Sequence, residues 1–334
     1  MVYTLGSMKA MVSQKYGPPE TMELREIAAP TPGEAEVLIK VAAASVNAWD
    51  WHLLMADPFL VRIGGMGFFR PKFKVLGADL AGTVTAVGKG VTAFAEGDEV
   101  YGSVSDTGGA FAEYACARPA MITRKPEHIT FAEAAAVPMA ALTALQGLRD
   151  VGEIRAGERV LVNGASGGVG TFAVQIAKAF DTEVTAVCSG PKVGLLRLLG
   201  VDEVIDYTTT DFTRQGILYD LIFDGAGTVT LSGADHALAD GGRCAVAGFS
   251  SMGSMLRTAL FGRRLSKKSG KKMAMVSEKP NAADLEIMND LMAAGKVKPI
   301  VEKAFPLEEA GAALRHLYEG RARGKVVVLV SESS

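Results

Sequence analysis

Cysteine is scarce in this chain, and long apolar runs are missing. Only three cysteines occur among 334 residues, at Cys116, Cys188 and Cys244. An odd number at wide spacing argues against a disulfide framework and favours a reducing compartment, for which we expect the cytoplasm. No stretch approaches the ~20 apolar residues that a membrane helix needs, so we expect no membrane partner.

Patterns that bind zinc are missing as well. The four histidines are scattered and no cysteine pair is close, whereas a zinc alcohol dehydrogenase needs Cys or His ligands that converge on the metal. Zinc catalysis would require Cys116 and His52 to meet a third ligand through folding. We therefore predict a site without metal, with a zinc alcohol dehydrogenase as an alternative.

Excess positive charge is also missing. The formal net charge is −2, and the one basic run, residues 263–272, suits a solvated surface or the rim of a phosphate site. We therefore expect no nucleic-acid partner. Hydrophobic residues make up 49% of the chain and charged residues 22%, a balance typical of a globular protein. The length of the chain suggests two domains.

The rhythm of the sequence changes near residue 131. Before it, short β-branched runs separated by Gly- and Pro-rich turns predict a mostly β domain. After it, helical stretches alternate with short strands, which predicts βαβ units and a parallel sheet. Its strands are expected at Arg159–Asn163, Glu183–Val187, Glu203–Asp206, Asp220–Phe223 and Arg243–Ala247, with a sixth at Met273–Val276.

The two ends of the chain are less clear. A helix within Pro306–Leu317 and a strand at Lys325–Val330 follow the parallel-sheet pattern, and periodicity does not decide which domain they join. Residues 1–7 end in Gly-Ser before a second methionine, so we expect them to be an added leader outside the fold.

The strongest motif is a glycine-rich turn after the strand at Arg159–Asn163. Ser166, Gly167, Gly168, Val169 and Gly170 lead into a helix that runs from Thr171 to about Phe180. Glycines let the backbone approach a pyrophosphate, and the amides at the start of a helix attract its charge. A tight turn without a ligand is the alternative, but strand, turn, helix and second strand together favour a dinucleotide site.

The end of the second strand indicates which dinucleotide is bound. Enzymes for NAD usually place Asp or Glu there to bind the ribose 2′-hydroxyl. Here Val187 is followed by Cys188-Ser189-Gly190-Pro191-Lys192, which contains no acid. Ser189 could donate a hydrogen bond to a 2′-phosphate and Lys192 could supply positive charge, so we predict NADPH. An ordinary surface lysine is the alternative for Lys192.

Residues 45–52 are the candidate substrate segment, because polar and aromatic side chains follow an apolar strand there. Asn47 could donate to a substrate carbonyl, and His52 is the plausible proton donor by type. Asp50 could line the pocket, although capping a helix is its more frequent role. Trp51 could stack on a flat substrate or pack against the core.

These motifs resemble the medium-chain dehydrogenase/reductase superfamily in its zinc-free, quinone-oxidoreductase-like branch, the relatives of zeta-crystallin. The resemblance rests on residues 45–51, on 76–84 together with 87–88 and 97–100, on the glycine turn and on residues 323–327. It implies a GroES-like β domain at 8–134 that is completed by 305–334, and a Rossmann domain at 135–304. It also implies a homodimer formed by Rossmann edge strands, here residues 272–277.

The resemblance implies roles for further residues. Thr143 should approach the nicotinamide, and Tyr207 should join Ser189 and Lys192 at the 2′-phosphate. The remaining cofactor positions are expected at strand ends and in the tail: Gly225, Gly248, Phe249, Gly324 and Lys325. Zinc-dependent relatives have Cys where this chain has Asn47, and His-Glu where it has Ala78-Asp79.

The activity predicted from these residues is NADPH-dependent, metal-independent transfer of hydride to a quinone or a similar electrophilic carbonyl. Related enoyl reductases often use a tyrosine as proton donor, and residues 47–54 contain none. Quinone reduction needs no protein acid and is therefore favoured. Reduction of the C=C bond of α,β-unsaturated aldehydes or ketones is the alternative, and a non-catalytic NADPH sensor is an alternative of another class.

Overall fold

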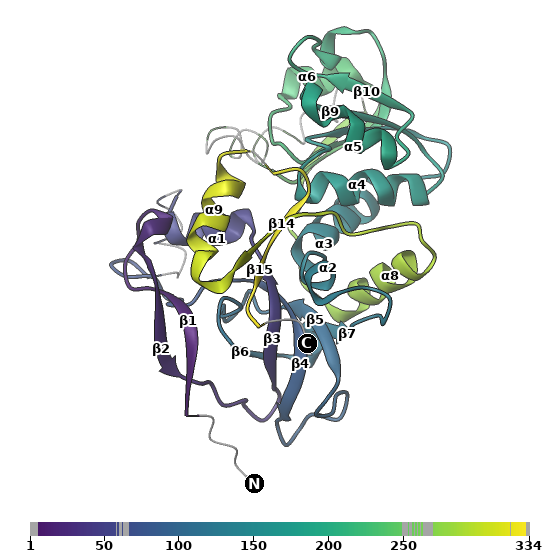
Figure 1. The fold of residues 1–334 in the computed structure, drawn as a ribbon. Helices are drawn as coiled ribbons and strands as arrows, with labels where there is room; N and C mark the ends of the chain where they lie inside the picture. Colours follow the sequence, from purple (N-terminus) through teal and green to yellow (C-terminus); the bar gives the residue numbers. More distant parts are fainter. Residues whose placement is uncertain are drawn as a thin grey trace. The chain divides into compact units, whose positions relative to one another are not determined.

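The computed structural model divides the chain into two compact units (Figure 1). It describes residues 6–57, 59, 62, 67–248, 253, 256, 258, 260, 262, 270–320 and 322–331. The β-rich unit comprises Met1–Met139, Pro280–Asn289 and Pro299–Ser334. The parallel-sheet unit comprises Ala140–Lys279 and Asp290–Lys298. No helix in the described ranges has the length and apolar character needed to cross a membrane.

The parallel-sheet unit contains a six-stranded sheet in the order β10-β9-β8-β11-β12-β13, with every neighbouring pair parallel. This is the Rossmann strand order, and the predicted α/β fold is confirmed. Its strands are β8 (Arg159–Asn163), β9 (Glu183–Cys188), β10 (Glu203–Asp206), β11 (Tyr219–Asp224), β12 (Leu238–Val246) and β13 (Lys272–Met275). The central strands β8 and β11 are buried because helices cover both faces of such a sheet.

The helices of this unit follow the strands as βαβ crossovers require. Helix α4 starts directly after the glycine turn and buries its apolar side, including Phe172 and Ile176, against the sheet. The helices are α3 (Pro138–Gln146), which begins in the β-rich unit, α4 (Gly168–Ala179), α5 (Val193–Leu198), α6 (Leu231–Ala237) and α8 (Ala282–Ala293), which spans residues of both units.

The β-rich unit is built on a seven-stranded sheet. Its order is β14-β15-β3-β4-β5-β7, and β6 pairs with β3; β1 and β2 form a separate hairpin. The strands are β1 (Ser7–Ser13), β2 (Met22–Ala28), β3 (Val37–Ser45), β4 (Asp79–Val87), β5 (Glu99–Ser103), β6 (Tyr114–Ala117), β7 (Ile122–Arg124), β14 (Val301–Pro306) and β15 (Lys325–Leu329). The helices are α1 (Ala48–Met55), α2 (Phe131–Ala135) and α9 (Ala310–Tyr318).

The tail, which periodicity left unplaced, belongs to the β-rich unit. Strand β15 pairs antiparallel with β3, with Val328 opposite Ala44. In Figure 1, helix α9 (yellow) lies beside α1, and the stacked rings of Trp51 and Tyr318 join the two helices. At the other end the fold takes in Ser7, which we had expected to lie outside it, because Ser7 pairs with Ala28 in the hairpin.

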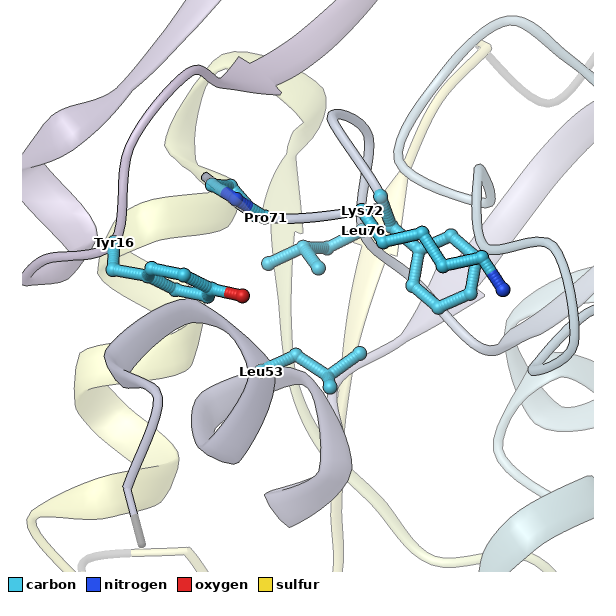
Figure 2. A pocket seen from close by; sticks show the side chains of 6 residues that line it. Tyr16, Leu53, Pro71, Lys72 and Leu76 are labelled. Atoms are coloured by element: carbon cyan, nitrogen blue, oxygen red, sulfur yellow. The ribbon is translucent and has the colours of Figure 1, made fainter. Parts of the chain in front are cut away.

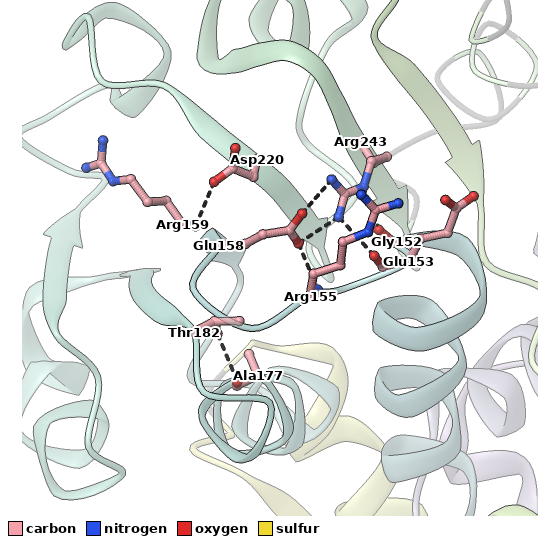
Figure 3. A network of polar contacts seen from close by, with 9 residues as sticks. All are labelled: Gly152, Glu153, Arg155, Glu158, Arg159, Ala177, Thr182, Asp220 and Arg243. Carbon is pink, nitrogen blue, oxygen red and sulfur yellow. Dashed lines mark hydrogen bonds and ion pairs between the residues drawn. The ribbon is translucent and has the colours of Figure 1, made fainter.

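At the amino-terminal edge of the parallel sheet, Arg243 and Glu158 form a bidentate ion pair, which we call the arginine fork (Figure 3). The Arg243 guanidinium donates to both carboxylate oxygens of Glu158 at 2.8 and 2.7 Å, and also to the carbonyls of Gly152 and Glu153. Both side chains are mostly buried, with 11% and 14% of their surface exposed. Bidentate pairing of this kind compensates the loss of water around both charges.

We expect Arg243→Met to lower the free energy of unfolding by about 3 kcal/mol, because it leaves Glu158 buried without its cation. The control is Arg159→Met, which breaks an exposed pair with Glu183 and should cost less than ~1 kcal/mol. Urea denaturation measures both values, provided that the unfolding free energies of the two variants depend equally on urea concentration. Equal midpoints for the two variants would show that the fork contributes no more than a surface ion pair.

Candidate functional site

The glycine turn joins β8 to α4 and has a shape that only glycine permits. Gly164 has φ +77°, and a Cβ on Gly170 would lie 2.1 Å from the Gly164 carbonyl oxygen. Gly167 caps α4, whose first amides have no partner within the helix and carry its positive dipole end. The five predicted residues, Ser166–Gly170, therefore form the end of the turn and the start of α4, and their contact with a phosphate stays a prediction.

A pocket of about 560 Å³ lies at the carboxyl ends of strands β8, β9, β10 and β11. Open α/β sheets bind ligands at this edge, beside the point where the strand order reverses, and this volume suits a small-molecule site. The residues that line it include Gly164, Val187, Tyr207, Thr210, Ala226 and Thr230. The residues present therefore fit the adenosine half of a dinucleotide.

Glycines predicted from the resemblance lie at the same edge. The Gly225 amide donates to the Asn163 carbonyl at 3.0 Å, and a Cβ on Gly248 would lie 2.4 Å from the Gly225 carbonyl oxygen. The buried Asp224 carboxylate holds this turn by accepting hydrogen bonds from Asn163 and from two backbone amides. Phe249, predicted beside them, lies outside the described residues.

The residues predicted for the 2′-phosphate come from two neighbouring strands. Ser189 and Lys192 follow β9, and Tyr207 follows β10 with 61% of its surface exposed. The Tyr207 amide donates to the Cys188 carbonyl at 3.1 Å, which brings the two strand ends together. Thr143 is half-buried on α3. Their contacts with a cofactor stay predictions.

A buried polar cluster lies in the β-rich unit, where β3, β4, α1 and β15 meet. The Lys325 ammonium donates to Asn47 Oδ1 at 2.5 Å, and Asn47 Nδ2 donates to Asp79 Oδ2 at 2.9 Å. Asp79 also accepts from Ser45 Oγ. Lys325 is only 4% exposed and Asp79 is fully buried. Asn47 thus joins a buried cation to a buried carboxylate.

Sequence reasoning missed this arrangement, although one signal was available. Asp79 and Lys325 are the first residues of two apolar strands, β4 and β15, and a lone charge in such a position needs a partner. The tail glycine Gly324 has φ +106°, and a Cβ there would lie 2.4 Å from the Ile300 carbonyl oxygen. The predicted closing of Gly324 and Lys325 over the cofactor stays a prediction, and the Lys325 ammonium here points to Asn47.

Burial governs the charges of the cluster. It raises the pKa of Asp50 to about 7 and raises the pKa of Asp79, whereas it lowers the pKa of Lys325. The amides of Asn47 and Gly77 donate to Asp50 at 2.8 and 2.9 Å and oppose the shift. Asp79 Oδ1 has no hydrogen-bond partner among the described residues.

The other residues of the predicted substrate segment point in different directions. Asp50 forms a capping box with Asn47 at the start of α1, as helix-capping Asp residues do. Trp51 is 9% exposed and stacks on Tyr318 with ring centres 3.7 Å apart. His52 is exposed, and its Nδ1 lies 2.5 Å from the Asp57 carbonyl oxygen. Because a carbonyl only accepts, Nδ1 carries the proton of the neutral ring.

A small apolar pocket lies next to α1 (Figure 2). Its lining includes Tyr16, Leu53 and Leu76, and its volume of about 10 Å³ suits one water molecule and no substrate. The Tyr16 hydroxyl donates to the Gly67 carbonyl at 2.6 Å. A tyrosine therefore lies near α1 in space, although the sequence segment 47–54 contains none.

The chain is similar to known oxidoreductases over most of its length. A family model described as an alcohol dehydrogenase GroES-like domain matches residues 33–127, and one described as zinc-binding dehydrogenase matches 199–328. A chloroplast envelope quinone oxidoreductase homolog of Arabidopsis thaliana is 34% identical, covering 92% of this chain and 93% of the relative.

Two further similarities point the same way. An NADPH-dependent alkenal/one oxidoreductase of Arabidopsis thaliana is 34% identical over 96% of this chain and 79% of the relative. The structure of the quinone oxidoreductase from Coxiella burnetii superposes with a TM-score of 0.85 at 29% identity, covering 97% and 100% of the two chains.

The chain belongs to the medium-chain dehydrogenase/reductase superfamily, in its quinone-oxidoreductase-like branch. The predicted family is confirmed, and so is its pairing of a GroES-like domain with a Rossmann domain. The relatives support NAD(P)H oxidoreductase activity on small molecules.

The buried cluster does not fit the zinc ion named in one family description. In the part of the chain that the structure describes, no three His, Cys, Asp or Glu side chains gather to hold a metal ion. The oxygen-bearing side chains of the cluster include Asn47 and Asp79, and the Lys325 ammonium already donates to Asn47 Oδ1. A divalent cation would meet that positive charge at close range.

The raised pKa of Asp50 predicts that stability falls as pH rises from about 4 to about 7. In this range the unfolded chain has released the Asp50 proton and the folded chain retains it, so folding loses up to ~1.4 kcal/mol per pH unit. Asp50→Asn should remove that contribution, and Asp57→Asn, an exposed neighbour, is the control. Parallel pH curves of the unfolding free energy for wild type and Asp50→Asn would contradict it.

Proposed function

We propose that the protein is an NADPH-dependent, metal-independent oxidoreductase that passes hydride to a quinone or a similar electrophilic carbonyl. The observation that carries the proposal is the pocket at the carboxyl edge of the parallel sheet. The glycine turn lies beside it, and Tyr207 lines it. When bound, the nicotinamide supplies the hydride, and the residues of the chain bind and orient the two reactants.

The choice of NADPH rests on charge at the end of β9. Lys192 ends the short turn that follows the strand, and Ser189 precedes that turn. A 2′-phosphate accepts hydrogen bonds from both residue types, and an ammonium neutralises part of its charge. The phosphates between the two nucleosides would be held by the amides of the turn at Ser166–Gly170.

Metal independence rests on the buried cluster. In zinc enzymes of the superfamily a cation polarises the substrate oxygen, and here the cation among these residues is the Lys325 ammonium, held by Asn47. Asn47 Nδ2 is directed to Asp79 at 2.9 Å and to the Ser45 carbonyl at 3.4 Å. Donation from Asn47 to a substrate would replace the longer, weaker of these contacts.

His52 is proposed as the proton donor, under one condition. Because Nδ1 faces the Asp57 carbonyl, Nε2 can give a proton only from the charged imidazolium. Quinone reduction tolerates the absence of this proton, because solvent can protonate the product. Trp51 and Asp50 are proposed to shape the pocket through the position of α1.

Reduction of the C=C bond of α,β-unsaturated aldehydes or ketones is the second candidate. The relative named as an alkenal/one oxidoreductase favours it. The hydride would go to the β-carbon, and the enolate oxygen would need a donor such as Asn47. We also propose a homodimer, because β13 is the edge strand of its sheet and has β12 as its neighbour there.

Steady-state oxidation of NADPH with 9,10-phenanthrenequinone and with an enone ranks the two candidates. We expect a higher kcat/KM for the quinone, and the same rates after chelation of metals, because the proposed site uses none. Faster turnover of the enone would favour the second candidate. Stopped-flow measurements test the third possibility. If the protein binds NADPH tightly and neither acceptor oxidises it, the protein is a non-catalytic NADPH sensor.

Lys192→Ala should raise the KM for NADPH about tenfold or more, because it removes one charge-assisted contact with the 2′-phosphate, and should leave the KM for NADH nearly unchanged. Arg197→Ala is the matched control, since Arg197 is an exposed cation on the helix that follows. Equal effects of Lys192→Ala on the two cofactors would refute the assignment of the 2′-phosphate site.

A further inference from the structure

An acidic side chain reaches the end of β9 from the neighbouring strand. Asp206 is the last residue of β10, and the strand register places it opposite Cys188, the last residue of β9. Asp206 Oδ1 accepts from the Thr208 amide at 3.0 Å and from Thr208 Oγ1 at 2.7 Å. The Gly190 amide also donates to this carboxylate. Asp206 therefore lies between the turns that follow β9 and β10.

The contact with Gly190 is close. A Cβ on Gly190 would lie 2.7 Å from Asp206 Oδ2, so the carboxylate packs directly against the backbone of the β9 turn. Ser189 precedes that glycine and Lys192 follows it by two residues. An anion held by Ser189 and Lys192 would therefore have the Asp206 carboxylate as a neighbour.

The charges of Asp206 and Lys192 both act on the carboxyl end of β9. The hydrogen bonds from Thr208 lower the pKa of Asp206, so the carboxylate is ionised at neutral pH. Burial raises the pKa of the Cys188 thiol most, the Asp206 charge raises it further, and the Lys192 charge lowers it. The end of β9 thus faces one negative and one positive group.

A carboxylate at this position discriminates between the two nicotinamide cofactors. An acid at the end of the second Rossmann strand accepts a hydrogen bond from a ribose 2′-hydroxyl and repels a 2′-phosphate. Asp206 brings a carboxylate to this strand end from the third strand, β10. We propose that Asp206 is a specificity-determining residue that limits the preference of this protein for NADPH over NADH. This inference rests on the proposed cofactor site. In it, the negative charge of Asp206 opposes the attraction between Lys192 and the 2′-phosphate.

The charge of Asp206 can be separated from its hydrogen bonds with Thr208. In Asp206→Asn the side-chain oxygen still accepts from Thr208, while the negative charge and the hydrogen bond from the Gly190 amide are lost. The second loss affects both nucleotides of the comparison below, whereas the charge affects mainly the one with the 2′-phosphate. Asp202→Asn is the matched control, because Asp202 accepts from the Val184 amide at the opposite end of β9. Both variants change the net charge of the protein by the same amount.

The experiment compares 2′,5′-ADP, which carries the 2′-phosphate, with 5′-ADP by titration calorimetry. We expect Asp206→Asn to bind 2′,5′-ADP about five to ten times more tightly than wild type, since one repulsive charge near the surface is removed. Binding of 5′-ADP should change by less than about twofold. Asp202→Asn should leave the ratio of the two affinities at its wild-type value.

The other outcomes contradict either the role of Asp206 or the proposed function. If wild type binds 2′,5′-ADP and Asp206→Asn leaves the ratio unchanged, Asp206 does not determine specificity. If wild type binds neither nucleotide, the proposed function fails and this inference fails with it. Thermal melting checks the fold, and Asp206→Ser, also neutral with an oxygen acceptor, replaces Asp206→Asn if the amide variant does not fold.

Discussion

The β-rich unit depends on the pairing of one buried cation with one buried carboxylate through a side-chain amide. The Lys325 ammonium, Asn47 and Asp79 come from β15, the start of α1 and β4, three segments that lie far apart in the sequence. A charge left alone in the interior would cost several kcal/mol, so none of these segments reaches its native position without the others. The cluster therefore specifies how the tail and the first half of the chain fit together.

The parallel-sheet unit depends on a different constraint, because the backbones of its turns approach one another closely. A Cβ on Gly170 or Gly248 would lie 2.1 or 2.4 Å from a backbone oxygen in the turns after β8 and β11, which is closer than a Cβ can approach. A Cβ on Gly164 or Gly225 would have tight contacts, at 3.0 and 3.3 Å. The turn leads directly into the start of α4, and the first amides of a helix can hold a phosphate. The chemistry of the pocket beyond that turn is left to side chains, and these come from the carboxyl ends of β9, β10 and β11 and the segments that follow them.

Local sequence predicted the elements well, because strands and turns are encoded by neighbouring residues. The glycine turn at Ser166–Gly170 has its strand and helix on either side, so its place was evident. The partners of Asp79, Lys325 and Asp206 were not, because they depend on register and on which strands become neighbours. Asp206 shows this most clearly, because the segment that ends β9 contains no acid and the strand pairing brings one there from β10.

The pairing of β15 with β3 also determines when each unit can be finished during synthesis. Residues 140–298, which contain the whole parallel-sheet unit, are synthesised before residues 325–329. The strands of the parallel sheet can therefore pair while residues 43–45 of β3 still lack their neighbour β15. Throughout that interval Asp79 has no ammonium to balance it, and an edge of the growing sheet stays open to chaperones and to other chains.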